Sequence, residues 1–408
     1  MAGWFSARAS ADAKLLLATR ALRGFADGAV SVILPSYLTA IGLGSFQVGA
    51  IVFGTLLGSA VLTLWVGLAG SRIAPRRILI SASVLMFATG IGFFSAAGFW
   101  TLFAVAVIGT MNPSAGDVSL FLPAEQTALA ESVADRDLTS MFGFYNVAGA
   151  IAGALGALAS GIPAIVAARA GSRPVAAERM VFLGYSIIAI IAGVVYAKLR
   201  QPTHQAPPTG AGASLGKSRR MVLKLSALFS LDAFGGGFVV QSLLALWLFR
   251  RFNLDLEVAG TFFFAAGLLG ALSQLLSTVV AARIGRVRTM AYTHIPANAL
   301  LIAAALMPNA RRAIALLLAR SALSSMDVPA RQSYVMAIVE PEERAAAASV
   351  TNVPRSLASA FAPLPAGALL DASNFGWPLI CAGGLKILYD LILLAQFRSA
   401  HPADEEVN

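Results

Sequence analysis

The chain has 408 residues, of which 12% are charged and 58% hydrophobic, and it carries 30 Lys and Arg against 20 Asp and Glu. Soluble domains carry about 25% charged residues, so lipid rather than water must surround most of this chain. These values exclude a soluble enzyme, a nucleic-acid-binding protein and a disordered chain. The single cysteine, Cys381, and three scattered histidines offer neither a disulfide nor a ligand spacing, so we expect no metal and no cofactor.

Apolar runs of helical length follow one another along the whole chain. A helix of about 20 residues crosses the ~30 Å hydrocarbon core of a bilayer, and the runs are too long and too continuously apolar for the strands of a barrel. The predicted fold is therefore an all-α integral membrane protein with twelve transmembrane helices. We expect them at residues 22–41, 46–70, 78–97, 100–130, 141–168, 179–199, 221–249, 258–282, 289–308, 312–338, 346–370 and 374–397.

Basic residues are distributed unevenly over the connections between these spans. With the N-terminus inside, the inner segments carry 19 Lys and Arg and the outer loops carry seven. Because Lys and Arg concentrate on the cytoplasmic side of membrane proteins, both termini are predicted to be cytoplasmic. Residues 1–22 lack the long apolar stretch of a cleaved signal peptide. We therefore expect a multi-pass protein of a bacterial-type cytoplasmic (inner) membrane.

The connection at residues 200–220 is rich in Pro, Gly, Ala and Ser, which indicates a cytoplasmic linker. It separates a predicted N-terminal six-helix bundle at 1–199 from a C-terminal six-helix bundle at 221–408. A shift of 206 residues brings the P-A-x-Q of residues 123–126 onto 329–332 and the N-V of 146–147 onto 352–353. Such a repeat predicts two pseudosymmetric bundles and a transporter whose site lies between them.

The loop after the second predicted span reads G-L-A-G-S-R-I-A-P-R-R over residues 67–77. It resembles the G-x-L-a-D-R-x-G-R-R motif of the major facilitator superfamily, with Ser71 in place of Asp and Ala74 in place of Gly. Together with the twelve spans and the central linker, the resemblance covers nearly the whole chain and implies the major facilitator fold. In that family the loop latches the inner gate. The candidate gating-loop residues, including the second-half counterpart, are Gly67, Arg72, Arg76, Arg77, Arg283 and Arg286.

The drug:proton antiporter branch of that superfamily is similar in size and span count. Two of its signatures are absent here, namely the Arg of span 4 and the Gly-Pro pair of span 5. Only a Gly-rich run at residues 149, 153, 156 and 161 corresponds to the second of these.

Ionisable side chains inside the spans are the clearest functional signal, since a charge at the bilayer centre costs at least ~2.5–3.5 kcal/mol on insertion scales. By analogy with the superfamily, spans 1, 4, 7 and 10 line the central cavity and hold seven of the ten such residues. Lys386 and Asp390, four residues apart on span 12, are interpreted as a structural pair within one helix. The ten are Asp27, Asp117, Glu125, Asp232, Arg320, Asp327, Arg331, Arg355, Lys386 and Asp390.

Three carboxylates are candidate proton-coupling residues. Asp27 and Asp232 occupy corresponding places in spans 1 and 7, and Asp117 lies in span 4. For Asp27 an alternative is an i,i+4 ion pair with Arg23 at the membrane edge.

Glu125 and Arg331 are candidate gate residues, because the 206-residue shift maps one onto the other. Equivalent residues near a pseudo-twofold axis face each other, so this acid and base could form an ion pair in one access state and lose it in the other. The alternative is a local pair between Asp327 and Arg331 on one helix. Arg320 and Arg355 are further substrate or gate candidates.

These features predict a secondary active transporter that works by alternating access and is not an enzyme. The main hypothesis is proton-coupled efflux of a small amphipathic compound, since several carboxylates and the aromatic run at 262–264 lie in the spans. The alternative is a proton-coupled transporter of a small organic anion or metabolite that uses Arg320, Arg331 or Arg355; a non-transporting sensor is the third. Without G-x-x-x-x-G-K-[ST] there is no sign of ATP driving. The expected partners are the substrate, protons and the lipid bilayer, with no nucleic acid, and we expect a monomer.

Overall fold

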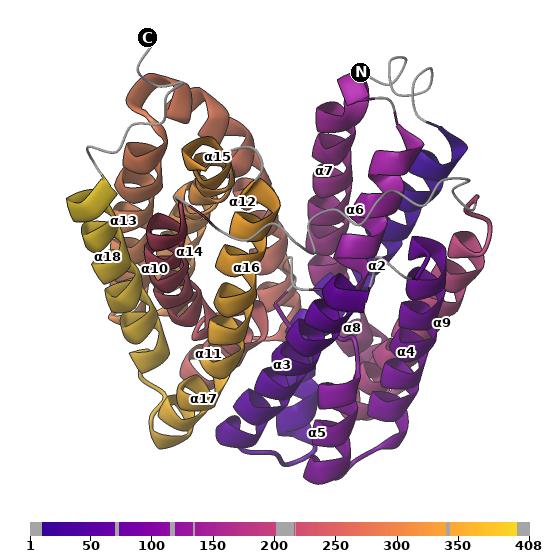
Figure 1. Cartoon of the computed structure of the whole chain (residues 1–408). Coiled ribbons are helices and arrows are strands. Elements are labelled where there is room, and N and C mark those ends of the chain that lie inside the picture. The colour runs from indigo at the N-terminus through magenta and orange to yellow at the C-terminus, as the bar shows by residue number, and fades with distance from the viewer. Residues whose placement is uncertain are drawn as a thin grey trace. The chain divides into compact units, whose positions relative to one another are not determined.

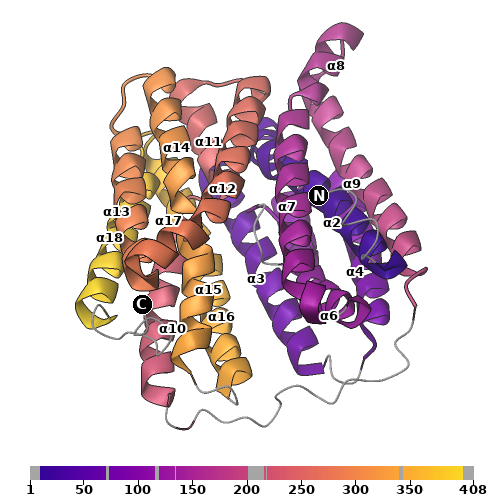
Figure 2. The ribbon, with the colours of Figure 1, turned by 90° about the horizontal axis from the view of Figure 1, so that it is seen from above.

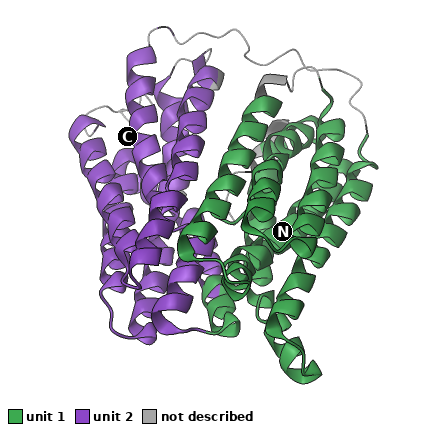
Figure 3. Cartoon of the chain, turned by 90° about the horizontal axis from the view of Figure 1, so that it is seen from below, with its two compact units in different colours: residues 1–208, 255–264 green, residues 209–254, 265–408 purple. Residues whose placement is uncertain are grey.

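The computed structural model describes residues 10–69, 73–114, 119–133, 135–200, 216, 218–339 and 343–397. Within these ranges the regular structure is helical, and no strand occurs. The chain divides into two compact units (Figure 3). Unit 1 comprises residues 1–208 and 255–264, and unit 2 comprises residues 209–254 and 265–408. The bundle boundaries predicted at residues 199 and 221 stay a prediction.

Unit 1 is built from eight described helices, shown in indigo to magenta in Figure 1, and the first residues of a ninth. Ser10 caps the first of them, since its side chain accepts a hydrogen bond from the amide of Ala13 at 3.0 Å. Proline at the first helical position starts α4 and α9. Helix α8 projects past the other helices of the unit (Figures 2 and 3). The helices are α2 (Ala11–Ala40), α3 (Ser45–Ala69), α4 (Pro75–Ser95), α5 (Phe99–Ile108), α6 (Phe121–Ser132), α7 (Asp135–Ala159), α8 (Ile162–Ala170) and α9 (Pro174–Tyr196).

Unit 2 contains the remaining helices, coloured salmon to yellow in Figure 1. Helix α12 begins in unit 1 and continues into unit 2. The described helices are α10 (Arg219–Gly237), α11 (Gln241–Phe252), α12 (Leu256–Ile284), α13 (Arg286–Ala305), α14 (Ala310–Ser324), α15 (Asp327–Ile338), α16 (Arg344–Phe361), α17 (Pro363–Ala372) and α18 (Trp377–Phe397).

The prediction of an all-helical membrane fold is confirmed. Eight segments of the described chain are long and apolar enough to cross a membrane. The other four predicted spans, at 22–41, 100–130, 289–308 and 346–370, also coincide with helices, namely α2, α5 with α6, α13, and α16 with α17. All twelve predicted spans therefore correspond to one helix or to two consecutive helices.

The second helices of spans 4 and 10 begin and end at corresponding places. Adding 206 to the bounds of α6 gives the bounds of α15, and the third residue of each helix is a proline, Pro123 or Pro329. Proline is tolerated in a first helical turn because the amide it lacks would have no intrahelical acceptor there. The repeat noticed in the sequence thus encodes a repeated helix start.

Glycines hold α2 and α7 at close range in unit 1. A Cβ atom on Gly28 would lie 2.0 Å from the carbonyl oxygen of Gly153, and one on Gly156 would lie 1.9 Å from that of Phe25. Only hydrogen side chains allow this backbone approach. The Gly-rich run of the predicted fifth span therefore has a packing role.

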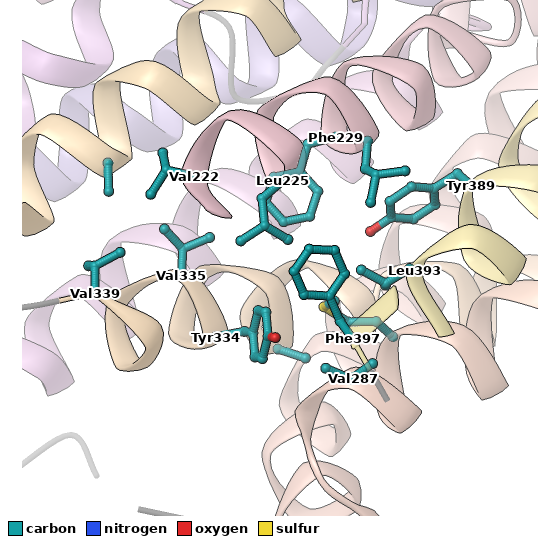
Figure 4. Close-up of a cluster of buried hydrophobic side chains, with 14 residues drawn as sticks. Val222, Leu225, Phe229, Val287, Tyr334, Val335, Val339, Tyr389, Leu393 and Phe397 are labelled. Carbon is teal, nitrogen blue, oxygen red and sulfur yellow. The ribbon is translucent and has the colours of Figure 1, made fainter. Parts of the chain in front are cut away.

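A buried apolar cluster joins α10, α13, α15, α16 and α18 in unit 2 (Figure 4). Phe229 and Tyr389 lie together at one end of it, with ring centroids 6.4 Å apart, and Val339 lies at the other end. Phe229 and Tyr389 also border the charged residues described below, so the cluster forms an apolar boundary on that side of them.

Candidate functional site

In unit 1 the polar centre is Glu125 on α6, whose side chain is fully buried. Arg23 of α2 and the hydroxyl of Tyr145 both donate to its Oε2, with the Arg23 ion pair lying inside the unit. The hydroxyl of Tyr196 donates to Oε1, and Thr19 does so at 3.4 Å. Each carboxylate oxygen thus accepts two hydrogen bonds, which fills the capacity of the group.

Arg23 is itself held on several sides. Its Nε donates to the Tyr196 hydroxyl at 3.1 Å and its Nη1 to Ser119 at 3.4 Å, and its guanidinium lies 4.0 Å from the centre of the Phe121 ring. Only 1% of the residue is exposed. A buried arginine is tolerated under such conditions because its charge is paired and its donors are occupied.

Asp27 lies one turn beyond Arg23 on α2 and is buried. It interacts electrostatically with Arg23 and Arg20 and neighbours Tyr185. The ion-pair partner of Arg23 is Glu125 rather than an acid on its own helix. Asp27 is therefore a second buried carboxylate near Arg20 and Arg23. Its role in proton coupling stays a prediction.

In unit 2 the polar centre is Asp232 on α10, which is 2% exposed. Lys386 of α18 donates to its Oδ1 at 2.7 Å, and Arg331 of α15 donates to its Oδ2 at 3.2 Å. The same Nη1 of Arg331 also donates to Asp327 at 3.3 Å, which is the i,i+4 pair that the sequence offered as an alternative. Asp232 thus connects three helices by two ion pairs.

His294 of α13 extends this network to a third acid. Its Nδ1 lies 3.1 Å from a carboxylate oxygen of Asp390, and its Nε2 lies 3.9 Å from Oδ1 of Asp232. The imidazole is 3% exposed and Asp390 is fully buried. Asp390 was interpreted as the partner of Lys386 on the same helix, whereas its hydrogen-bonding partner is His294 and Lys386 reaches across to Asp232.

The two other arginines named from the sequence lie at the edge of this network. Arg355 interacts electrostatically with Asp232, and Arg320 does so with Asp327. The Nε of Arg320 is buried and hydrogen-bonds no group in the part of the chain that the structure describes. A buried donor without a partner costs free energy; the role of Arg320 as a substrate or gate residue stays a prediction.

The gating-loop candidates surround the starts of α4 and α13. Arg76 donates to the carbonyl of Ala197, Arg77 and Arg283 are exposed, and Arg286 opens α13. Gly67 falls in α3, while Arg72 and Asp117 lie outside the described residues.

The two loops differ in how they turn into the following helix. Gly285 has φ of 84°, a conformation that glycine adopts readily, but Ala74 at the matching place has φ of −57°. The first loop therefore accommodates alanine without strain.

The sequence identified the acids and several bases of the two polar centres, but it missed several of the residues that hydrogen-bond to the acids. Tyr145, Tyr196 and His294 were not singled out, although His294 falls inside a predicted span, where any ionisable group is a functional candidate. Glu125 and Arg331 each have partners within their own unit. Their pairing with each other, as a gate, stays a prediction.

The family model for the Major Facilitator Superfamily matches residues 16–324. The chain belongs to the major facilitator superfamily. It is 26% identical over 430 residues to an uncharacterized membrane protein of Saccharomyces cerevisiae, covering 95% of this chain and 94% of the relative.

Solved transporter structures share the fold. A bacterial homolog of the human lysosomal transporter Spinster, in an inward-facing and unoccupied conformation, has a TM-score of 0.74 at 14% identity and covers 95% of this chain and 96% of its own. The nucleoside transporter NupG has a TM-score of 0.74 at 13% identity, and the match covers 95% of this chain and 100% of NupG. The D-xylose-proton symporter has a TM-score of 0.72 at 16% identity, and the match covers 93% of this chain and 96% of the symporter. This superfamily member is thus a multi-pass membrane transporter and not an enzyme.

Proposed function

We propose that this transporter is driven by protons and moves a small amphipathic compound out of the cytoplasm by alternating access. The observation that supports proton coupling is the buried carboxylate of Asp232, which Lys386 and Arg331 bind through different oxygens and which His294 approaches to 3.9 Å. Burying an ion costs several kcal/mol, and apolar packing would often serve stability as well as a buried ion pair. A network of this kind is useful where its members exchange protons or partners.

Proton binding at Asp232 would change the helix contacts around it. A neutral carboxyl attracts Lys386 and Arg331 less strongly, so the ties from α10 to α18 and to α15 would weaken. Arg331 would keep Asp327, while Lys386 would need a new partner. Such a change of partners between packed helices is a physical basis for a two-state element.

The substrate class rests on the apolar and basic groups of the spans. The run of phenylalanines at 262–264 in α12 favours an amphipathic compound, with Phe262 and Phe263 in edge-to-face contact at 4.7 Å. The second candidate, a small organic anion, is favoured by Arg320 and by Arg20, whose buried Nε atoms hydrogen-bond no described group. The inner-membrane location, the cytoplasmic termini and the monomeric state belong to this proposal too.

Transport by purified protein in liposomes separates these possibilities. With an imposed pH gradient, an amphipathic cationic dye and a set of organic anions would be measured in parallel. We expect gradient-driven movement of the dye that stops when nigericin collapses the gradient. Movement of anions alone would favour the second candidate, and fluxes indifferent to the gradient would overturn proton coupling.

A matched pair of variants controls this test. Asp232→Asn should lose gradient-driven transport but retain exchange of substrate across the membrane. Asp255→Asn makes the same chemical change at an exposed position just before α12 and should transport normally.

A further inference from the structure

His294 occupies a position between two acids that the proposed mechanism leaves unused. Its two ring nitrogens face different carboxylates, Asp390 at 3.1 Å and Asp232 at 3.9 Å. The second of these distances ends on Oδ1, the oxygen to which Lys386 donates at 2.7 Å. One oxygen atom is thus shared by an ammonium that is bonded to it and an imidazole nitrogen just beyond bonding distance.

The hydrogen-bond partners assign the imidazole proton. An ionised Asp390 can only accept, so Nδ1 carries the hydrogen and Nε2 presents a lone pair toward Asp232. A lone pair and a carboxylate oxygen repel each other, which accounts for a separation of 3.9 Å. A proton taken up from water by Nε2 would turn this repulsion into a charge-assisted hydrogen bond.

We propose that His294 is a second proton-binding residue beside Asp232, and that its protonation displaces Lys386 from Asp232. In the neutral form Lys386 occupies Oδ1 of Asp232, and Asp390 orients the ring. When Nε2 binds a proton, the imidazolium is drawn to Oδ1 and its charge repels the ammonium already bonded there, so Lys386 is released. This inference rests on the proposed proton-coupled function and names a positioning residue for it. Imidazole suits the task because it ordinarily changes charge between about pH 5 and 8.

The helices around this network carry charged or titratable groups. Helix α18 presents Asp390, Lys386 and Tyr389, the last with its ring centroid 6.3 Å from that of His294, and α10 presents Asp232. Helix α15 acts through the Asp327 and Arg331 pair, and α16 through Arg355. The charged residues of helix α14 are all basic, namely Arg311, Arg312 and Arg320.

Release of Lys386 would affect the seventh span where its two helices, α10 and α11, meet. The stem of Lys386 packs on glycines at the end of α10, since a Cβ atom on Gly235 would lie 3.1 Å from its Cγ and one on Gly236 would lie 3.5 Å from its Nζ. Helix α10 ends at Gly237, and α11 begins at Gln241. The lysine thus braces the junction of two half-helices, and its departure frees that junction to move.

Histidine-selective NMR tests the proton-binding step on the full chain in nanodiscs without any substrate. The chain has only three histidines, so His204→Gln with His401→Gln leaves His294 as the sole histidine signal. We expect the ring signals of His294 to change between pH 8.5 and pH 5, from those of an Nδ1–H tautomer to those of an imidazolium. Ring signals that stay unchanged from pH 5 to 8.5 would overturn the proposal, and this measurement needs no substitution at 294.

Distance measurements between spin labels test the consequence. Labels at Glu131→Cys and Arg344→Cys, in a Cys381→Ser background, would report the populations of conformers at pH 5.5 and 8.5. We expect a population ratio that changes about tenfold with pH in the parent chain and less than twofold in His294→Gln. His294→Lys, which carries a fixed charge, should show the acidic distribution at both pH values.

The outcomes distinguish this inference from the function on which it rests. If His294→Gln keeps the full pH response, or His294→Lys still responds to pH, the inference fails even when liposomes show proton-driven transport. If wild-type liposomes show no effect of the pH gradient, the proposed function fails whatever His294 does. Asp232→Asn should leave His294 titrating but remove the pH response of the distances, because the acid that both cations share is gone.

Discussion

The two units tie corresponding helices together with ion pairs of opposite polarity. In unit 1 the base is on α2 and the acid on α6, as Arg23 and Glu125, whereas in unit 2 the acid is on α10 and the base on α15, as Asp232 and Arg331. Glu125 is saturated by four donors, two per oxygen. Asp232 is shared among Lys386, Arg331 and His294, of which Arg331 also pairs with Asp327 and His294 with Asp390. The hydrogen bonds of Glu125 allow one stable pairing, whereas the ion pairs around Asp232 allow several. We therefore propose that unit 1 anchors its helices and that unit 2 switches.

Removal of Glu125 is the most direct test of the anchoring role assigned to unit 1. Glu125→Leu should destabilise the protein by about 3–5 kcal/mol, because Arg23 remains buried without its partner. Thermal unfolding in detergent measures the loss. The double change Glu125→Leu with Arg23→Met should recover most of it, since an apolar pair of similar volume costs little. A single variant as stable as wild type would show that Glu125 anchors nothing.

The gate hypothesis uses a gentler change at the same acid. If Glu125 pairs with Arg331 in one access state, Glu125→Gln should shift the population of spin-label distances between Glu131→Cys and Arg344→Cys by tenfold per ~1.4 kcal/mol lost. Charge exchange, Glu125→Arg with Arg331→Glu, should recover part of the shift. If the single variant leaves the distances unchanged, the pairs within each unit are the better account.

In unit 2 the same kind of removal should cost less stability and more function. Asp232→Asn leaves Lys386 without its acid, but Arg331 keeps Asp327, so we expect the low end of the range, about 3 kcal/mol. Gradient-driven transport should be abolished while exchange persists. Should Asp232→Asn prove the more destabilising of the two, the assignment of anchor and switch would be reversed.

The glycine contact between α2 and α7 gives a second test of whether unit 1 is the more rigid unit. Gly28→Ala places a methyl group 2.0 Å from the carbonyl oxygen of Gly153 and should cost about 1–3 kcal/mol by forcing the helices apart. Gly184→Ala is the matched control, because nothing lies within 4 Å of its Cβ position. Equal melting temperatures for the two variants would contradict close packing at Gly28.

The smallest expected effect concerns the two gating loops. Gly285→Ala should lose about 1–2 kcal/mol, because φ of 84° brings the new Cβ close to the backbone. Ala74→Gly should lose at most about 1 kcal/mol, through the added freedom of the unfolded chain alone. Denaturation of both variants in the same detergent gives the comparison. A larger loss for Ala74→Gly would mean that the loops differ in some way other than backbone conformation.

Much of the architecture could be predicted because it depends on local pattern. Span length follows from the thickness of the bilayer, and every predicted span coincides with one helix or two. The prolines at 123 and 329 marked the repeat, and both prove to lie in the first turn of matching helices. The glycine run of the fifth span was visible in the sequence, but its packing partner, α2, was not.

The pairing of charges was decided by tertiary structure alone. Spacing in the sequence offered Asp390 to Lys386 and Asp27 to Arg23, four residues apart in each case, yet the bonds run to Asp232 and Glu125. The sequence determines which charged residues are buried, because a charged side chain within a long apolar span lies at membrane depth, away from water. Which ones meet depends on how each helix is rotated about its axis, and glycines against bulky neighbours set that rotation. For this reason Lys386 lies across Gly235 and Gly236 and reaches an acid 154 residues away.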